Sequence, residues 1–207
     1  MTFPTFESAD FDVFHISGLE PRMEALIERV RPKLTLLGEQ LAPFLSAHCG
    51  EPMFPHVAKH ARRTINPPAD TWVAWANSKK GYKAHPHFQV GLWSTHLFIQ
   101  FAVIYESDNK EIFARHLEQR LDDLRRLIPA DFRWSTDHMQ PESTAHGDMS
   151  SDDFVRMIDK LKRVKKTEAL CGIRIERNDP LLADADRFAD TIRHTFERVM
   201  PLYRLAF

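Results

Sequence analysis

The sequence has few cysteines, no long apolar run and none of the common nucleotide or catalytic motifs. Cys49 and Cys171 belong to no CxxC pair, as is usual for a reducing compartment, and Cys171 lies in an apolar stretch typical of a core thiol. No stretch approaches the ~18 apolar residues of a membrane span. The first residues lack the basic and apolar regions of a signal peptide. We therefore expect a cytoplasmic protein that is not inserted in a membrane.

The missing motifs also limit what can be said about activity. There is no GxGxxG, no P-loop, no GxSxG and no calcium-binding loop, so the main signatures of dinucleotide, nucleotide, esterase and calcium sites are lacking. The sequence names no cofactor and no substrate. It leaves open whether the protein is an enzyme, and it does not indicate an oligomeric state.

The composition is that of a folded globular protein. Of the 207 residues, 43% are hydrophobic and 28% are charged, and 15 Phe and 4 Trp supply large apolar side chains. A chain of this length suits one domain with a sizeable core. Because no linker or repeat interrupts it, we expect a single domain over residues 1–207.

The hydrophobic pattern predicts an α+β fold with a largely antiparallel central sheet covered by several amphipathic helices. Apolar residues at both parities predict central strands, and two of these strands are separated by so few residues that they must form a hairpin. Helical spacing predicts the helices, with an interruption at Pro32 and a second break or a kink at Pro43. The expected strands are residues 70–77, 88–93, 96–106 and 168–176, with an edge strand at Phe132 and Trp134. The expected helices cover residues 19–48 in pieces, 110–128, a segment capped by Ser150 or Ser151, and one opened by Asp179-Pro180, while residues 137–149 form a long loop.

Residues 53–94 carry a local positive charge. Six basic residues against Asp70 alone give this segment +5, which leaves −6 for the rest of a chain whose net charge is −1. Guanidinium and ammonium groups suit phosphate or carboxylate, and histidine titrates near neutral pH. The sequence thus favours a small anionic ligand here, with Lys59, His60, Arg62, Arg63, Lys83 and His87 as the candidate binding residues. Trp72, Trp75, Tyr82 and Trp93 offer rings for stacking, although core packing is the commoner role of tryptophan.

The same segment contains an HxxxH and an HxH pattern. His56 and His60 would share a face of a helix, and His85 and His87 would share a face of a strand. Such pairs can bind a metal ion. However, 11 histidines make chance pairs common, and the glutamate of zinc proteases is absent beside His56. The sequence therefore offers these four as metal candidates without favouring a metal site. A nucleic-acid or protein interaction module remains a further alternative.

A family resemblance rests on the same central run. Residues 53–64 (MFPHVAKHARRT), residues 66–74 (NPPADTWVA), and then Gly81-Tyr82-Lys83, residues 85–89 and residues 91–93 resemble the YktB-like family of uncharacterised bacterial proteins. Residues 11–14, 22–26 and 30–34 extend the match, so the resemblance covers most of the chain. It implies an α+β fold and a cytoplasmic protein of Gram-positive-type bacteria. It implies no activity and no catalytic residues, because the function of the family is unknown.

Overall fold

A seven-stranded antiparallel sheet forms the centre of the protein, in a computed structural model that describes residues 2–207. The strand order is β1-β2-β3-β4-β7-β5-β6, and every neighbouring pair is antiparallel. The strands are β1 (Phe54–Val57), β2 (Asp70–Ala76), β3 (His87–Trp93), β4 (His96–Val103), β5 (Arg133–Ser135), β6 (Thr144–Ala145) and β7 (Ala169–Glu176). The expected α+β class and the hairpin between β3 and β4 are confirmed.

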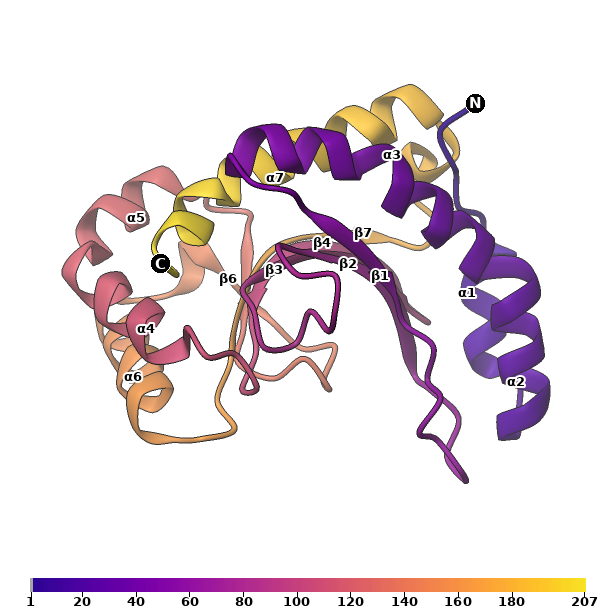
Figure 1. Cartoon of the computed structure of the whole chain (residues 1–207), viewed down its shortest axis with the longest axis horizontal. Helices are drawn as coiled ribbons and strands as arrows, with labels where there is room; N and C mark the ends of the chain where they lie inside the picture. The colour runs from indigo at the N-terminus through magenta and orange to yellow at the C-terminus, as the bar shows by residue number, and fades with distance from the viewer. Residues whose placement is uncertain (1) are drawn as a thin grey trace.

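Helices lie over one face of this sheet. In Figure 1, α3 and α7 cross above it, while loops hang below its opposite face. The helices are α1 (Ser8–Asp12), α2 (Leu19–Ala25), α3 (Arg31–Cys49), α4 (Lys110–Gln119), α5 (Leu121–Leu127), α6 (Ser151–Arg163) and α7 (Ala185–Arg204). Short 3-10 turns cover Val13–His15, His146–Asp148 and Pro180–Ala183, and a π-helical turn covers Leu26–Val30. None of the helices within residues 2–207 is both long and apolar enough to span a membrane.

The main core lies between the sheet and the helices. Trp75 of β2 and Phe88 of β3 both contact Phe196 of α7, with ring centroids 5.7 and 5.1 Å apart. Phe101 of β4 contacts Phe113 of α4 in the same way at 5.8 Å. These rings are almost fully buried. Large aromatic side chains at facing positions of adjacent strands thus help to hold the helices to this face.

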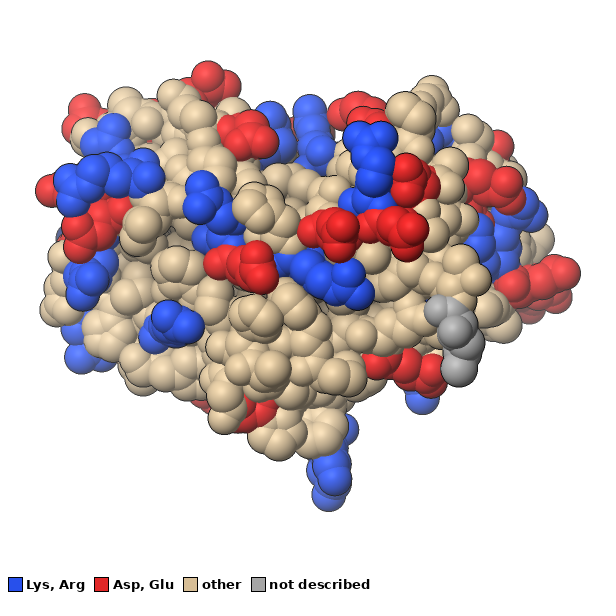
Figure 2. All heavy atoms as spheres, turned by 90° about the horizontal axis from the view of Figure 1, so that it is seen from above, with Lys and Arg blue, Asp and Glu red and all other residues tan. Residues whose placement is uncertain are grey.

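Charged side chains of both signs are interspersed on the outside of the helical layer (Figure 2). This view shows no broad area of one sign. Ion pairs within single helices contribute to the mixture, such as Arg193 with Asp190 at 3.2 Å in α7. Exposed pairs of this kind add little stability. The helical face in this view therefore shows no local concentration of positive charge.

Prolines affect the long N-terminal helix less than expected. Residues 19–49 form one uninterrupted helical run, in which the π-helical turn at Leu26–Val30 ends two residues before Pro32. A wider turn removes the clash between the proline ring and the preceding carbonyl groups, so the chain continues without a break. Pro43 lies inside α3 and does not end it. The predicted interruption at Pro32 and a break at Pro43 are therefore wrong, while a kink at Pro43 stays a prediction.

Other boundaries differ from the predictions as well. The helix expected over residues 110–128 is divided at Arg120 into α4 and α5. Phe132 precedes β5, which pairs with both β6 and β7 and so is not an edge strand. The edges are β1 and the two-residue β6, and neither was predicted. The loop expected over residues 137–149 contains β6 and a 3-10 turn.

Candidate functional site

The face of the sheet opposite α3 and α7 carries two neighbouring hollows. We call the first the sheet-face pocket; its lining includes Asp70, Trp72, Trp93, His96, Gln100, Arg133, His138 and Arg174. We call the second the basic groove; it is lined by residues 55–62 together with Trp72, Gly81, Tyr82, Lys83 and Glu106. Trp72 lines both. The two hollows therefore share one wall residue, Trp72.

Two loops form the basic groove. The loop after β1 supplies Lys59, His60 and Arg62, and the loop between β2 and β3 supplies Lys83. The groove has a volume of about 570 Å³, which is within the range of small-ligand sites. The Lys83 ammonium lies 3.2 Å from the carboxylate of Glu106, so one acid partly balances the three cations.

His60 has a backbone conformation that is unusual for a residue other than glycine. Its φ is +51°, and its carbonyl accepts a hydrogen bond from the Arg63 amide in a tight turn. The imidazole makes a T-shaped contact with the Trp72 ring, with ring centroids 5.6 Å apart, and its Nε2 lies 3.3 Å from the Thr71 hydroxyl. Burial lowers the pKa of His60 to about 4, with help from the charges of Arg63 and Arg31. A residue with an unusual backbone conformation and a shifted side-chain pKa, located at a hollow, is a common feature of functional sites.

The remaining two anion-binding candidates lie outside the groove. Arg63 turns toward the carbonyl of Asn66, at 3.3 Å, and does not line the groove. His87 is fully buried beneath Tyr82, with ring centroids 4.9 Å apart. Four of the six predicted residues, Lys59, His60, Arg62 and Lys83, are therefore brought together.

The four metal candidates do not form a common cluster. His56 lies in β1 and His60 in a turn, so the helix that would place both on one face does not exist. His56 Nε2 lies 2.7 Å from the carbonyl of Ser78, and both nitrogens of His87 are hydrogen-bonded. Within residues 2–207, the only group of three or more potential ligands within 4.8 Å of one another is Asp137, His138 and Glu168.

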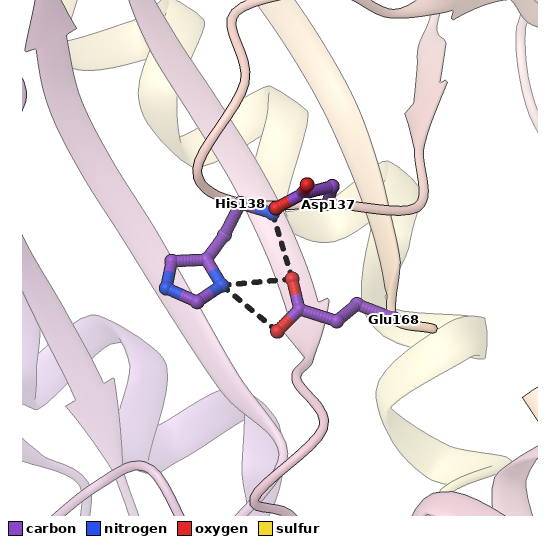
Figure 3. Close-up of side chains that lie close together, drawn as sticks. All are labelled: Asp137, His138 and Glu168. Carbon is purple, nitrogen blue, oxygen red and sulfur yellow. Dashed lines mark hydrogen bonds and ion pairs between the residues drawn. The ribbon is translucent and has the colours of Figure 1, made fainter. Parts of the chain in front are cut away.

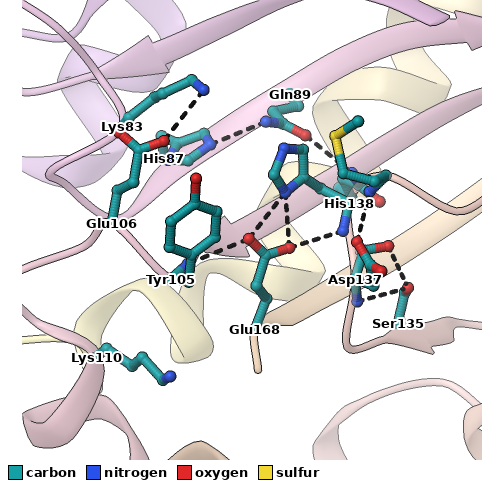
Figure 4. A network of polar contacts seen from close by, with 12 residues as sticks. Lys83, His87, Gln89, Tyr105, Glu106, Lys110, Ser135, Asp137, His138 and Glu168 are labelled. Carbon is teal, nitrogen blue, oxygen red and sulfur yellow. Dashed lines mark hydrogen bonds and ion pairs between the residues drawn. The ribbon is translucent and has the colours of Figure 1, made fainter. Parts of the chain in front are cut away.

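A chain of hydrogen bonds crosses β3 and β4 beside the sheet-face pocket. The Gln100 amide donates to the Gln89 carbonyl oxygen at 2.9 Å, and the Gln89 amide donates to His87 Nε2 at 2.9 Å. His87 Nδ1 then donates to the carbonyl of His85 at 2.8 Å. Since Nε2 accepts, His87 is neutral, and burial lowers its pKa to about 4. Figure 4 shows His87 and Gln89 above His138.

His138 and Glu168 form a close and largely buried polar contact near this pocket (Figure 3). His138 Nδ1 lies 2.8 Å from both carboxylate oxygens of Glu168. The backbone amides of His138 and Tyr105 also donate to this carboxylate, at 2.7 and 3.2 Å. Glu168 is only 1% exposed, and these donors give its buried carboxyl oxygens hydrogen-bond partners. Asp137 accepts from the Met139 amide, so hydrogen bonding explains the cluster without a metal.

Asp70 is a buried carboxyl at the start of β2. It is 7% exposed, lines the sheet-face pocket and pairs in register with Trp93 of β3. Burial raises its pKa to about 6, although the charges of His138 and Arg63 act to lower it. An acid with such a pKa can hold or release a proton near neutral pH.

Most residues of the sheet-face pocket were not singled out in the sequence. His138, Arg133 and Arg174 lie far from residues 53–94 in the sequence, and only the fold brings them into one pocket with Asp70. One sequence signal does exist. Gln89 and Gln100 interrupt otherwise apolar strands, at the parity that faces away from the helices. Polar side chains in a doubly buried strand need partners, and so indicate a polar site.

Comparison with known proteins identifies relatives along the whole chain. Residues 6–203 match the family described as "Domain of unknown function (DUF1054)". A UPF0637 protein of Bacillus velezensis is 52% identical over 205 residues, covering 99% of this chain and 98% of the relative. UPF0637 proteins of Bacillus cytotoxicus and Bacillus cereus are 47% and 48% identical, with 99% of each chain covered. The resemblance found in the sequence is thereby confirmed, and the chain belongs to the DUF1054 family of bacterial proteins of unknown function.

Proposed function

We propose that this protein binds a small anionic ligand in the basic groove, through a phosphate or carboxylate group. The observation that supports the proposal is the convergence of Lys59, His60, Arg62 and Lys83, from two separate loops, on one hollow of about 570 Å³. Charged groups scattered for solubility alone have no reason to meet in a concavity. Their meeting beside aromatic rings is typical of a ligand site.

The charges of the groove favour an anion. Lys59 and Arg62 are exposed and lie on the same loop, so their ammonium and guanidinium groups are free to turn toward a ligand. Lys83 is held near them by Glu106, and both members of that pair are partly exposed. The three cations exceed the one carboxylate of the lining, and a bound anion would also benefit from the positive field of Arg31 and Arg63 nearby.

The rings of the groove suggest that the ligand also has a flat part. The Trp72 indole N–H donates to the Tyr82 hydroxyl at 2.8 Å, which fixes the two rings relative to each other. His56 contacts Tyr82 on the same lining, with ring centroids 5.6 Å apart. Fixed aromatic surfaces bind planar groups at low entropic cost. We place this activity in the cytoplasm, a location supported by the two unpaired cysteines, Cys49 and Cys171.

Ligand titration followed by tryptophan fluorescence tests the proposal, because Trp72 lines the groove. The probes are inorganic phosphate and adenosine 5′-monophosphate, which differ by the flat group. We expect both to bind, the nucleotide more tightly. The double variant Lys59→Gln with Arg62→Gln should weaken binding at least tenfold, since charged hydrogen bonds are each worth about 1.5–3 kcal/mol.

The matched control is Lys80→Gln, which removes an exposed positive charge from the loop between β2 and β3 without touching the lining. It should leave the affinity within about twofold of wild type, because exposed charges are screened. Equal losses in the control and the double variant would reduce the effect to net charge. The proposal would be contradicted if neither probe bound at millimolar concentration.

A further inference from the structure

We propose that the sheet-face pocket is an acid–base site, where His138 and Asp70 exchange protons with a small oxyanion-bearing molecule held by Arg174 and Arg133. This site is separate from the basic groove and does not depend on ligand binding there. All four residues line the same pocket, although they come from β2, β5, β7 and the loop after β5. The proposal rests on how each of them is held.

Glu168 fixes the orientation of His138. Because Nδ1 lies 2.8 Å from the carboxylate, it carries the hydrogen of the neutral ring, and Nε2 is left to accept a proton. The Tyr105 ring stacks at 6.3 Å and 23°, which limits rotation of the imidazole. Figure 4 shows Glu168 below the imidazole and Tyr105 beside it. A histidine oriented by a buried carboxylate in this way is the arrangement used by general bases.

Several charges set the proton affinity of His138. Burial acts to lower its pKa, but the hydrogen bond and the charge of Glu168 outweigh burial, so the pKa is raised. Lys83 opposes this effect, and Asp70 assists it. Asp137 and Glu142 also line the pocket, but both are exposed and therefore screened by water. His138 is thus a stronger base than a free imidazole.

Asp70 is the second proton carrier. No other side chain in the described residues hydrogen-bonds to its carboxyl, although it is 7% exposed. A buried carboxyl without a cationic partner favours its protonated form. Asp70 and His138 feel each other's charge. The two groups therefore differ in environment, and pairs of this kind divide the roles of acid and base.

Two guanidinium groups supply the anion-binding part of the pocket. The Arg133 side chain is fixed by the hydroxyl and carbonyl of Ser143 and leaves donors unused. Arg174 is 36% exposed, and its nearest carboxylate is Glu176 at 3.6 Å. Gly172 of β7, the in-register partner of Arg133, also lines the pocket. The cavity volume of about 50 Å³ accommodates only a few waters or one oxyanion group.

The aromatic wall makes these charges effective. Trp72, Trp93 and Phe98 line the pocket and exclude water from one side of it. In such surroundings, interactions between a ligand oxyanion, a guanidinium and a proton donor are stronger than in water. A bound oxyanion would also favour protonated His138 and protonated Asp70. Anion binding at this site should therefore take up protons.

Calorimetry and NMR test this linkage with inorganic phosphate as the probe. Phosphate binding is measured near pH 6.5 in buffers of different ionisation enthalpy, which gives the number of protons taken up beyond the titration of phosphate itself. The histidine ring resonances are followed in the same samples. We expect net proton uptake and an upward shift of the His138 titration. The variants His138→Gln and Asp70→Asn should each reduce the uptake, because each removes one proton carrier.

Arg174→Gln should weaken phosphate binding at this site about tenfold. Its matched control is Arg193→Gln, which removes a similarly exposed arginine with one nearby carboxylate, on α7. The groove variant Lys59→Gln with Arg62→Gln should leave the shift of His138 unchanged, which separates the two proposals. If phosphate leaves the wild-type His138 titration unaltered, or if binding takes up no proton, the acid–base site is refuted. Glu168→Gln supplies a further check, because it should lower the pKa of His138 in any protein that remains folded.

Discussion

Gly91 of β3 is the in-register partner of two aromatic residues, Trp72 and Phe98, that line the sheet-face pocket. It pairs with both Trp72 and Phe98, and a Cβ atom at this position would lie 2.4 Å from the Phe98 ring and 2.6 Å from the Thr71 carbonyl oxygen. Both distances are far inside van der Waals contact. Only glycine therefore allows the two aromatic side chains to pack across the middle of β3.

Gly91→Ala should destabilise the protein by about 3 kcal/mol, at the upper end for an overpacked core. It should also change the fluorescence of Trp72, because the indole must move. The comparison is Gly50→Ala, which meets nothing within 4 Å and costs about 1 kcal/mol through its positive φ alone. Urea unfolding measures both. A smaller loss for Gly91→Ala than for Gly50→Ala would show that the strand adjusts without strain.

Residue identity alone predicted the basic groove better than the sheet-face pocket. Lys59, Arg62 and Lys83 are close in sequence, so a local excess of charge revealed them. His138 and Glu168 are 30 residues apart and meet only because β5 and β7 are neighbours in the sheet. A single sequence contains no local signal that predicts contact between two such distant residues. Strand order, which depends on the packing of the whole molecule, decides it.

At the scale of elements, the N-terminal cap of α6 illustrates a locally determined structure. The Ser150 hydroxyl accepts from the Asp153 amide, and the Asp153 carboxylate accepts from the Ser150 amide. Ser150→Ala should cost about 1 kcal/mol and lower the melting temperature by about 2–4 °C. Thermal unfolding by circular dichroism measures this change. Ser151→Ala, one position into the helix, is the control; it removes only an exposed hydrogen bond from Arg125 to the Ser151 hydroxyl, so an equal shift would show that the cap contributes nothing specific.

The sequence predicted elements well where local rules dominate and less well where tertiary contacts do. The central strands follow from apolar residues at both parities and α6 from its serine cap, and both are confirmed. The π-helical turn before Pro32 could not be predicted from local rules. Two of its residues, Leu26 and Val30, are buried in the core, so the turn depends on tertiary contacts. Likewise, β1 is too short and too poor in alternation to identify, and only its pairing with β2 makes it a strand.

For the whole molecule, buried histidines make stability dependent on pH. Burial lowers the pKa of His60, His87 and His96 to about 4, from an ordinary value of 6.5. Between these values the unfolded chain binds more protons, so the stability present above pH 6.5 is lost as the pH falls toward 4. Asp70 acts in the opposite sense, because its pKa is raised to about 6.

Near pH 5 the unfolded chain therefore binds about two more protons than the folded protein. The free energy of unfolding then falls by about 2–3 kcal/mol for each pH unit of acidification. Urea unfolding at several pH values from 4.5 to 7 measures this slope. His87→Gln should reduce it by about 1.4 kcal/mol per pH unit. His48→Gln, at an exposed position, should not. An unchanged slope in His87→Gln would mean that this ring is already protonated in the folded protein.

The two edge strands of the sheet, β1 and β6, affect whether molecules of this protein can associate by pairing their strands. An open sheet presents unpaired backbone groups at each side, and another chain can add to them. Here β6 is only two residues long, and Pro55 in the middle of β1 has no amide hydrogen to offer. Neither side can template a further strand over any length. Molecules at high concentration should therefore remain distinct rather than join into a continuous ribbon, even though the sheet itself is not closed.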